Sequence, residues 1–409
     1  MVRLLCFLCA LGGVVQAGPA PLDAPTGVSP YTQVQTSNIR FNRWISGFRA
    51  RALDAGISEA VFDRAFRGIN YNTTVIERDR TQSEFSKTLW DYLDTAVSDA
   101  RVRNGRAVLQ DRRALLSQIE NTYGVDAEIV TAIWGLESAY GAVRGRTDVI
   151  EAMATLAYDG RRAEFFETQL LAALKIVQSG ETAPRNMVGS WAGAMGHTQF
   201  IPTSFLDYAV DGDGDGRRDI WGDNPADALA STANYLLAFG WTAGQPWGVE
   251  VRLPDGFHYA NARRENTKLP SEWAALGVTD LDGVAVPDHG AASILLPGGA
   301  EGAAFMIFDN FEVLEAYNTA DAYVIGVGHL ADCIAGGGPI QAAWPRGDRA
   351  LTGDERRELQ QRLTDAGFDT VKIDGRVGPL TINAIRNFQL ANGLTPDGYA
   401  SVRLLNRLR

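Results

Sequence analysis

Apolar residues recur every three or four positions through most of the first 240 residues, which is the pattern of amphipathic helices. The first such helix is predicted at residues 41–56, and Gly56 follows it as a stop. One face of this helix carries Phe41, Trp44, Ile45 and Phe48. A second helix is predicted to begin after Ser58, whose side chain is of a type that caps helix N-termini. Further helices are predicted at residues 81–105 (with Phe85, Leu89, Tyr92 and Leu93 on one side), 111–124, 147–159, 161–179 and 224–240.

The period changes between Gly240 and about Asn310. Residues 248–253, 291–296 and 303–311 are short and apolar, and Gly and Pro separate them, as is typical of strands. A helix is predicted to return at residues 311–334. The sequence therefore predicts a mainly α-helical domain over residues 39–334 that carries a small β-rich insertion at about 241–310.

The last third of the chain ends in a separate unit. Residues 335–350 are rich in Gly and Pro and are predicted to be a linker. Residues 351–409 are predicted to form a small three-helix module, in which an Asp-Gly turn followed by a helix occurs twice. The residues expected to face its core are Leu359, Leu363, Ile382, Ile385 and Phe388.

Composition limits the class of protein. A chain of 409 residues is long enough for two or three domains, and 45% hydrophobic with 21% charged residues is typical of a soluble globular protein. A formal net charge of −11 argues against a nucleic-acid partner, because phosphate binding depends on clustered Lys and Arg.

The N-terminus has the pattern of a secretion signal over residues 1–17, with Arg3 before an apolar run and a small-residue cleavage site at Ala17. Residues 18–38 contain four prolines and are predicted to be an extended leader. Cys333 is the only cysteine outside the signal, so no intrachain disulfide is expected. We therefore predict an exported, periplasmic monomer without a membrane anchor.

The stretch 125–141 is the predicted centre of the chemistry. Ile129, Ile133 and Leu136 form an apolar helical face, and Gly141 is expected to end the helix about one turn after Glu137. Apolar surroundings and the negative end of the helix dipole both disfavour the anion, so the pKa of Glu137 is predicted to rise. A protonated carboxyl near neutral pH can act as a general acid. The alternative is a surface glutamate in the last turn of an ordinary helix.

Residues 187–204 combine three glycines with His197, Gln199 and Pro202. Glycines permit close backbone approach to a ligand, and a Gln or hydroxyl can hydrogen-bond to a sugar acetamide. His197 alone is more often structural than catalytic, and metal binding is less expected, because no second His or Cys lies at ligand spacing.

The sequence DGDGDGRRD at residues 211–219 matches a calcium-binding loop of the EF-hand type. Its predicted ligands are the side chains of Asp211, Asp213, Asp215 and Asp227 and the backbone carbonyl of Arg217. Position twelve is Gly222 rather than the usual Glu, so Asp223 is an alternative last ligand to Asp227. The other interpretation is an acidic, Gly-rich turn without metal.

Taken together, these motifs resemble the lytic murein transglycosylases of the MltB type. The matching segments are WGLESAYG, Arg161-Arg162, SWAGAMGHTQFIPTS, the Asp-rich loop, ANYL and YNTADAY, in that order. The segment DGRVGPLTINAIRNFQ resembles a peptidoglycan-binding module. The resemblance implies a lysozyme-like α-domain in which Glu137 is the sole acid/base and no cofactor is required for the chemistry, with a structural Ca²⁺ in the Asp-rich loop. It also implies substrate-binding roles for Tyr92, Arg161, Arg162, Ser190, Gln199, Tyr235, Tyr317, Asn318 and Tyr323.

The implied reaction is cleavage of the MurNAc–GlcNAc β-1,4 bond of peptidoglycan with formation of 1,6-anhydroMurNAc ends. An ordinary glycosidase needs a second carboxylate, and Asp148, Glu151 and Asp159 lie nearby in sequence as candidates. From the residues alone Arg161 and Arg162 are equally consistent with a solvated helix start, and the tyrosines with core positions. A hydrolytic muramidase and a non-catalytic wall-binding scaffold are the alternative functions.

Overall fold

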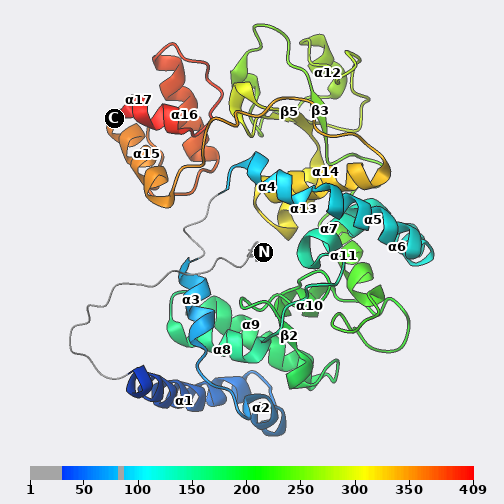
Figure 1. Cartoon of the computed structure of the whole chain (residues 1–409), viewed down its shortest axis with the longest axis vertical. Helices are drawn as coiled ribbons and strands as arrows, with labels where there is room; N and C mark the ends of the chain where they lie inside the picture. Colours follow the sequence, from blue (N-terminus) through cyan, green and yellow to red (C-terminus); the bar gives the residue numbers. More distant parts are fainter. Residues whose placement is uncertain (1–29, 82–86) are drawn as a thin grey trace. The chain divides into compact units, whose positions relative to one another are not determined.

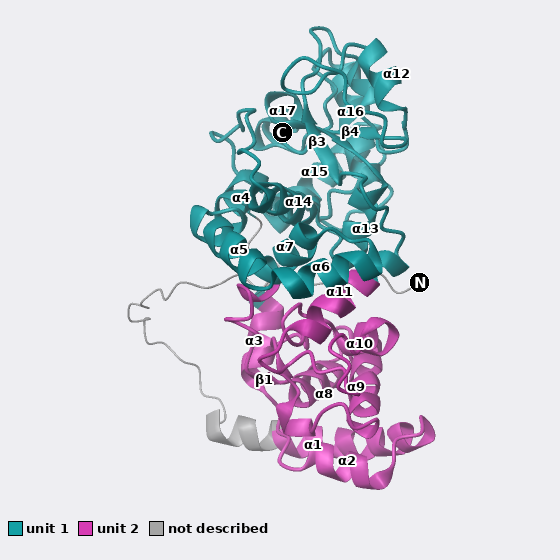
Figure 2. Ribbon diagram, turned by 90° about the vertical axis from the view of Figure 1, so that its right-hand side faces the viewer, with its two compact units in different colours: residues 1–5, 81–136, 235–409 teal, residues 6–80, 137–234 magenta. Residues whose placement is uncertain are grey.

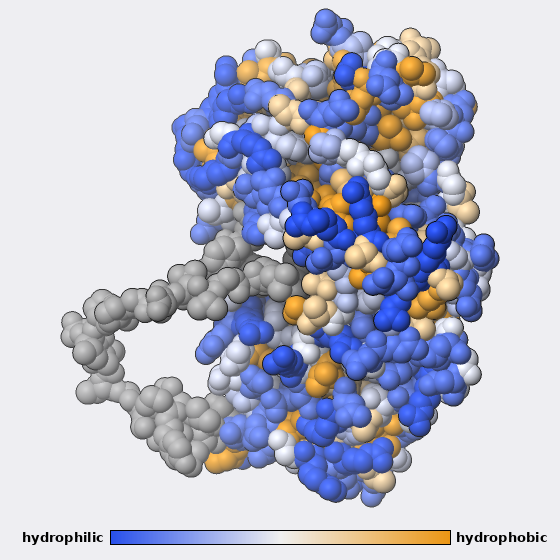
Figure 3. All heavy atoms as spheres, turned by 45° about the vertical axis from the view of Figure 1, so that its right-hand side comes forward, coloured by the Kyte–Doolittle hydropathy of each residue, from blue (hydrophilic) through white to orange (hydrophobic). Residues whose placement is uncertain are grey.

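The computed structural model describes residues 30–81 and 87–409, and side-chain burial from residue 38 onward. The predicted secretion signal, the first part of the predicted leader and Phe85 lie outside the described residues. The fold is mainly helical, as the sequence predicts, with two small sheets (Figure 1). Within the described residues no helix is long and apolar enough to cross a membrane. The visible face in Figure 3 is largely hydrophilic with smaller hydrophobic areas.

The chain divides into two compact units, drawn in different colours in Figure 2. Of the described residues, unit 1 contains Thr81, 87–136 and 235–409, whereas unit 2 contains 30–80 and 137–234. One of the divisions falls between Leu136 and Glu137, inside a single helix.

Unit 2 consists of helices around a two-stranded antiparallel sheet. Its elements are α1 (Pro30–Asp54), α2 (Glu59–Phe66), α3 (Thr73–Thr81, as far as Arg80), β1 (Thr147–Asp148), α8 (Val149–Asp159), α9 (Ala163–Gln178), β2 (Val188–Gly189), α10 (Pro202–Tyr208) and α11 (Ala226–Ala238, as far as Asn234). The helix α1 begins at Pro30 rather than near Phe41. As predicted, the Ser58 hydroxyl accepts the backbone N–H of Val61 and caps α2, and Gly160 in left-handed conformation separates α8 from α9.

Unit 1 contains the remaining helices and a three-stranded sheet. Its elements are α4 (Leu89–Ala96), α5 (Asp99–Asp111), α6 (Arg113–Tyr123), α7 (Ala127–Ser138, as far as Leu136), β3 (Gly248–Val251), α12 (Pro270–Ala275), β4 (Ser293–Leu295), β5 (Ala304–Ile307), α13 (Asp309–Tyr317), α14 (Asp321–Ala335), α15 (Gly353–Asp365), α16 (Pro379–Ala391) and α17 (Val402–Leu408). Each of two helices that the sequence predicts as continuous, at residues 81–105 and 311–334, is divided in the structure. The chain breaks at Val97–Ser98 between α4 and α5, and again at Asn318, whose backbone is extended (φ −152°, ψ 123°).

The predicted β-rich insertion is present. The strand order is β3-β5-β4, with both pairs antiparallel, so Val249 lies opposite Met306 and Ile294 lies opposite Met306 on the other side. The insertion has its own core around Trp273, which is fully buried and donates its indole N–H to the Ala292 carbonyl (2.8 Å). A buried indole with a satisfied N–H supplies both apolar contact and a fixed orientation.

The C-terminal helices α15, α16 and α17 enclose a second small core (Figure 1). Leu359, Leu363, Ile385 and Phe388 belong to it as predicted, whereas Ile382 is only half-buried. Residues 336–350, the predicted linker, contain no helix or strand, but they are anchored to other parts of unit 1. Glu250 accepts the backbone N–H groups of Gln341 and Ala342, and Arg346 forms an ion pair with Asp94 (2.8 Å).

Replacing Trp273 with Ala is expected to destabilise the insertion by about 3–5 kcal/mol, because it removes a fully buried ring and the hydrogen bond from its indole N–H to the Ala292 carbonyl. The measurement is urea unfolding followed by fluorescence. Leu276→Ala, at a nearby residue that is 46% exposed, is the matched control and should change stability by less than about 0.5 kcal/mol. Equal effects of the two substitutions would contradict a core role for Trp273.

Candidate active site

Glu137 is the penultimate residue of α7, and its side chain is half-buried. The helix around it is buried on more than the predicted face: Val130, Ala132 and Trp134 are buried as well as Ile129 and Ile133. The carboxyl therefore belongs to the end of a core helix rather than to an amphipathic surface helix. The packing of the neighbouring elements around α7 therefore fixes the backbone position of Glu137.

The helix ends at Ser138, earlier than the sequence predicts. Ala139, Tyr140 and Gly141 are all left-handed (φ 50°, 59° and 85°). Only the glycine adopts this conformation without cost, and each of the other two costs about 1–2 kcal/mol. Tertiary contacts must therefore hold the chain in this turn directly after Glu137.

Ser138 supplies two of these contacts. Its buried hydroxyl donates to the His197 carbonyl (2.5 Å) and accepts the backbone N–H of Gly141 (2.9 Å). The Ser138 carbonyl accepts the N–H of Val143 (2.8 Å). One side chain thus closes the left-handed turn and ties it to residues 187–204. No local sequence pattern indicates this role of Ser138, because its partner His197 is 59 residues away.

Residues 187–204 form a tightly folded segment. Its backbone makes bridges from Gly189 to Met195 and from Met195 to Phe200. A Cβ on Gly145 would overlap the Gly189 carbonyl, one on Gly189 the Ala194 carbonyl, and one on Gly196 the Ile220 carbonyl. These glycines therefore permit backbone segments of the protein to approach one another. The sequence pattern had predicted a close approach of the backbone to a ligand instead.

Two of the predicted substrate residues lie in this segment. The Ser190 hydroxyl accepts the backbone N–H groups of Ala192 (3.3 Å) and Ala194 (3.1 Å), which shapes the turn at its own position. Gln199 is left-handed (φ 57°) and its amide donates to the Gly196 carbonyl (2.9 Å) and the Arg144 carbonyl (3.2 Å). Both side chains are buried and held in place. Their substrate-binding roles stay predictions.

His197 is structural in this arrangement. Its Nε2 lies 2.8 Å from the Gly222 carbonyl and 3.2 Å from Arg144 Nη1. Arg144 donates to the same carbonyl and to that of Trp221 (2.8 Å) and pairs with Asp223 (3.0 Å). Burial lowers the pKa of His197 below its ordinary value, and the nearby positive charge of Arg144 lowers it further. The buried imidazole and Arg144 together hold residues 197 and 222 close to each other.

Arg161 and Arg162 both pair with Asp79, which is 2% exposed. Arg161 Nε donates to Asp79 Oδ2 (2.6 Å), and this bond raises the pKa of Arg161. Arg162 also lies over the Phe166 ring (4.7 Å to its centroid). Both guanidinium groups therefore neutralise a buried carboxylate, and the Arg161 side chain is at the same time 52% exposed. No sequence pattern indicated Asp79, since its partners are 82 and 83 residues away.

Three carboxylates that follow Glu137 nearby in sequence have structural partners. Asp148 caps α8 through the N–H of Glu151 (2.9 Å) and pairs with Arg185. Glu151 accepts the Asn72 amide (2.9 Å), and Asp159 accepts the Tyr71 hydroxyl (3.3 Å). Each of these carboxylates fastens one element of unit 2 to another.

The remaining predicted substrate residues lie in unit 1. Tyr235, Tyr317, Tyr323 and Asn318 are each less than 5% exposed. The rings of Tyr317 and Tyr323 are stacked at 6.4 Å, and the Tyr235 ring meets that of Tyr317 edge-on at 5.1 Å. The Tyr235 hydroxyl donates to the Ala316 carbonyl (2.7 Å). Tyr92 packs beside Gly326 of α14, where a Cβ would lie 2.8 Å from the Tyr92 ring. Tyr235, Tyr317 and Tyr323, which belong to two separate sequence motifs, thus form one aromatic cluster.

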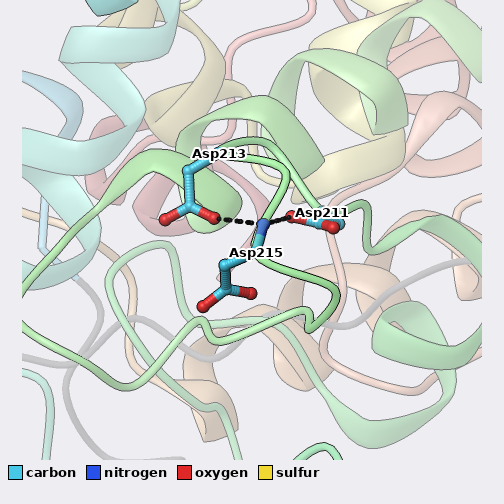
Figure 4. A group of neighbouring side chains, drawn as sticks. All are labelled: Asp211, Asp213 and Asp215. Atoms are coloured by element: carbon cyan, nitrogen blue, oxygen red, sulfur yellow. Dashed lines mark hydrogen bonds between the residues drawn. The ribbon is translucent and has the colours of Figure 1, made fainter.

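The Asp-rich loop brings three carboxylates together. Asp211, Asp213 and Asp215 each offer an oxygen, and these oxygens lie within 4.8 Å of one another (Figure 4). Asp211 also accepts the N–H groups of Gly214 (2.7 Å) and Gly216 (2.8 Å), which are left-handed. Clustered hard oxygen ligands on a tight loop fit a calcium ion.

The two candidates for the last calcium ligand have different surroundings. Asp227 is buried, and its carboxylate accepts the N–H groups of Gly212 (2.8 Å), Asp213 (3.3 Å) and Asp219 (2.7 Å). Burial raises the pKa of Asp227 above its ordinary value. Asp223 is exposed and paired with Arg144. Asp227 therefore fixes the loop from inside, and its predicted metal contact, like that of Arg217, stays a prediction.

Comparisons with known proteins agree with this architecture. The sequence profile of the transglycosylase SLT domain family matches residues 40–332, and that of a peptidoglycan binding domain matches residues 352–408. The chain is 34% identical over 252 residues to membrane-bound lytic murein transglycosylase B of Escherichia coli (strain K12). That match covers 60% of this chain and 66% of the relative, so the chain spans just under two thirds of the relative's length.

Solved structures are similar over most of the chain. SltB3 from Pseudomonas aeruginosa, in complex with NAG-anhNAM-pentapeptide, superposes with a TM-score of 0.88 at 50% identity, over 90% of this chain and 99% of SltB3. The Escherichia coli lytic transglycosylase Slt35, in complex with calcium, gives a TM-score of 0.61 at 29% identity, over 73% of this chain and 93% of Slt35.

The lowered pKa of His197 predicts a pH-dependent stability. The folded protein binds fewer protons at this ring than the unfolded chain, so stability is full above the unfolded pKa of about 6.5 and falls as the pH drops below it. Unfolding free energies of wild type and His197→Gln, measured between pH 8 and pH 5, check this. Burial also lowers the pKa of His329, which is present in both proteins, so their difference isolates His197. Parallel curves would contradict the prediction.

Proposed function

The chain belongs to the transglycosylase SLT domain family, and we propose that it is a lytic transglycosylase that cleaves the MurNAc–GlcNAc β-1,4 bond of peptidoglycan and leaves 1,6-anhydroMurNAc ends. The observation that carries this proposal is the position of Glu137. It is a half-buried carboxyl at the end of a core helix, followed by a strained turn that Ser138 holds in place.

In the proposed reaction Glu137 first donates its proton to the glycosidic oxygen, and the bond from that oxygen to C1 of the muramyl ring breaks. The C6 hydroxyl of the same ring then bonds to C1, and Glu137 recovers the proton that this hydroxyl releases. No water is consumed, and the single carboxyl returns to its starting state. A carboxyl near a helix C-terminus meets the negative end of the helix dipole, which favours the protonated acid that the first step needs.

The surroundings of the other carboxylates support one acid/base rather than two. A hydrolytic glycosidase needs a second carboxyl as nucleophile or as base for water. Asp148, Glu151 and Asp159, which lie near Glu137 in sequence, accept hydrogen bonds from Glu151, Asn72 and Tyr71 that fasten elements of unit 2. Intramolecular attack by a hydroxyl of the substrate removes the need for such a base, because the nucleophile is already positioned.

We propose that the glycan strand is bound by the polar and aromatic side chains to which the family resemblance assigns this role. Ser190 and Gln199 are held rigidly by backbone contacts, as groups that orient a sugar must be. Asn318 supplies an amide, Tyr235, Tyr317 and Tyr323 supply clustered rings, and Tyr92 supplies a further ring beside Gly326. For Arg161 and Arg162 we propose a contribution through their pairing with Asp79, which anchors α3 to the start of α9.

We also propose that the C-terminal module binds peptidoglycan, that the protein acts as an exported, periplasmic monomer and that a structural calcium ion occupies the Asp-rich loop. The profile match to a peptidoglycan binding domain, the calcium complex of Slt35 and the cluster of Asp211, Asp213 and Asp215 support these proposals. Calcium would be held by the loop carboxylates and would stiffen the connection between α10 and α11. The proposed chemistry uses no metal.

Glu137→Gln is expected to lower the release of soluble fragments from isolated peptidoglycan by about 10²–10⁴-fold, because the amide cannot donate and recover a proton. Mass spectrometry of wild-type digests should show anhydro ends, which are lighter by one water than hydrolytic ends. The matched control is Glu164→Gln, an exposed glutamate of unit 2, which should retain full activity. Reducing ends alone would indicate a muramidase, and absence of any release would indicate a binding scaffold.

Calcium should raise the melting temperature, because a ligand that binds only the folded state stabilises it by mass action. At a free concentration about 100 times the dissociation constant, the gain is about 2.7 kcal/mol. Differential scanning calorimetry with and without Ca²⁺ measures it. The variant Asp213→Asn should lose most of this increase, whereas Asp255→Asn, at an exposed site outside the loop, should keep it. An unchanged wild-type transition at millimolar calcium would overturn the proposal.

A further inference from the structure

The repeated Asp-Gly turn of the C-terminal module is a structural repeat as well as a sequence repeat. The first turn is Asp374-Gly375-Arg376, and the second is Asp397-Gly398-Tyr399. The two glycines are buried and left-handed, with φ of 74° and 77°. Each turn comes before one of the last two helices, α16 and α17, respectively (Figure 1).

A buried glutamine from the preceding helix holds each turn in the same way. The Gly375 N–H donates to Gln360 Oε1 (2.8 Å), and the Gly398 N–H donates to Gln389 Oε1 (2.9 Å). The amide of Gln360 donates to Asp374 Oδ1 (3.3 Å), and that of Gln389 donates to Asp397 Oδ1 (2.7 Å).

The same aspartate oxygen also accepts a backbone N–H within its own turn. Arg376 N donates to Asp374 Oδ1 (2.8 Å), and Tyr399 N donates to Asp397 Oδ1 (3.0 Å). In both turns Oδ1 therefore accepts hydrogen bonds from within the module. The two turns differ in the surroundings of the second carboxylate oxygen, Oδ2.

The second turn uses this oxygen to hold a peptide segment. Asp397 Oδ2 accepts the backbone N–H of Ala300 (3.0 Å), which belongs to the β-rich insertion. A Cβ on Gly299 would lie 2.8 Å from Tyr399, so only a residue without a side chain fits against this turn. The ion pair of Arg403 with Glu301 (3.0 Å) flanks the contact. The turn thus recognises a short backbone segment of small residues.

The first turn presents the same group to solvent. Asp374 and Arg376 are exposed, whereas Asp397 and Tyr399 are half-buried under the insertion. Among the hydrogen bonds of the described residues, those that Asp374 accepts involve Oδ1, and none involves Oδ2. Its hydrogen bond from Arg376 lowers the pKa of Asp374, so the carboxylate is ionised at neutral pH.

Large apolar side chains flank this turn in the sequence. Val371, Ile373 and Leu380 are 63%, 43% and 54% exposed. Val371 is also left-handed (φ 66°), which is unfavourable for a β-branched residue. Exposed apolar groups and backbone strain beside a preformed hydrogen-bond acceptor are typical of a binding surface rather than of a scaffold.

We propose that the Asp374-Gly375-Arg376 turn binds the peptide component of peptidoglycan, with Asp374 Oδ2 accepting a backbone N–H of the peptide as Asp397 Oδ2 accepts that of Ala300. Ile373 and Leu380 supply apolar contacts beside it. This inference rests on the proposed function, because it names the part of the polymer that the C-terminal module recognises. The second turn is occupied within the chain and serves to attach the module to the insertion.

The test is a pull-down of the full chain with two forms of insoluble peptidoglycan, one intact and one treated with an amidase that removes the peptides. All proteins carry Glu137→Gln so that cleavage does not release them. In this background Asp374→Asn keeps one oxygen, which can still accept hydrogen bonds from Gln360 and Arg376. It replaces Oδ2 with an amide group that can only donate. It is expected to weaken binding to intact peptidoglycan about tenfold. Asp354→Asn, a 98% exposed carboxylate of the same module with the same charge change, should leave binding unchanged.

A second variant covers the case in which Asp374→Asn unfolds the module. Ile373→Ser lies outside the glutamine network and should weaken binding several-fold, with an unchanged melting temperature. If the parent protein binds intact and peptide-free polymer equally, or if Asp374→Asn and Ile373→Ser bind as tightly as Asp354→Asn, the peptide site is wrong. If the parent protein binds neither polymer, the proposed function of the module itself has failed.

Discussion

The hydroxyl of Ser138 holds the end of α7 in place, and the arrangement around Glu137 depends on it. Ala139 and Tyr140 occupy a conformation that L-residues avoid, and this conformation is maintained only while the surrounding contacts outweigh its cost. Ser138 donates to the His197 carbonyl and accepts the Gly141 N–H, which ties the strained turn to a buried loop. The turn that directly follows Glu137 is therefore held by a contact that spans 59 residues.

The same principle governs the loop that Ser138 reaches. Gly145, Gly189 and Gly196 allow three backbone segments to pack without intervening side chains, and His197 and Arg144 then fasten the Gly222 carbonyl. Polar groups in this region are paired with backbone atoms, which makes the region rigid. Rigid positioning is what a general acid and its substrate-orienting neighbours require, because small displacements of a catalytic group cost large factors in rate.

Charge is also used for positioning in unit 2. Arg161 and Arg162 neutralise the buried Asp79, and Asp148, Glu151 and Asp159 connect helices through hydrogen bonds. A buried carboxylate without a partner is costly, so each pairing restricts how the elements can pack. Within the C-terminal module Gln360 and Gln389 have the equivalent role, since each accepts the glycine N–H of an Asp-Gly turn and holds that turn in place.

The sequence by itself determined the mainly helical class, most helix positions, the β-rich insertion, the three-helix module and the identity of the family. These features depend on local periodicity, capping residues and contiguous motifs, which are written in neighbouring positions. Only the tertiary structure decided that α7 ends at Ser138, that two long predicted helices are broken, and that Asp79 is the partner of Arg161 and Arg162. Each of these depends on contacts between residues far apart in the chain, and a hydrogen bond or ion pair across 59 or 82 residues leaves no periodic signal in the sequence.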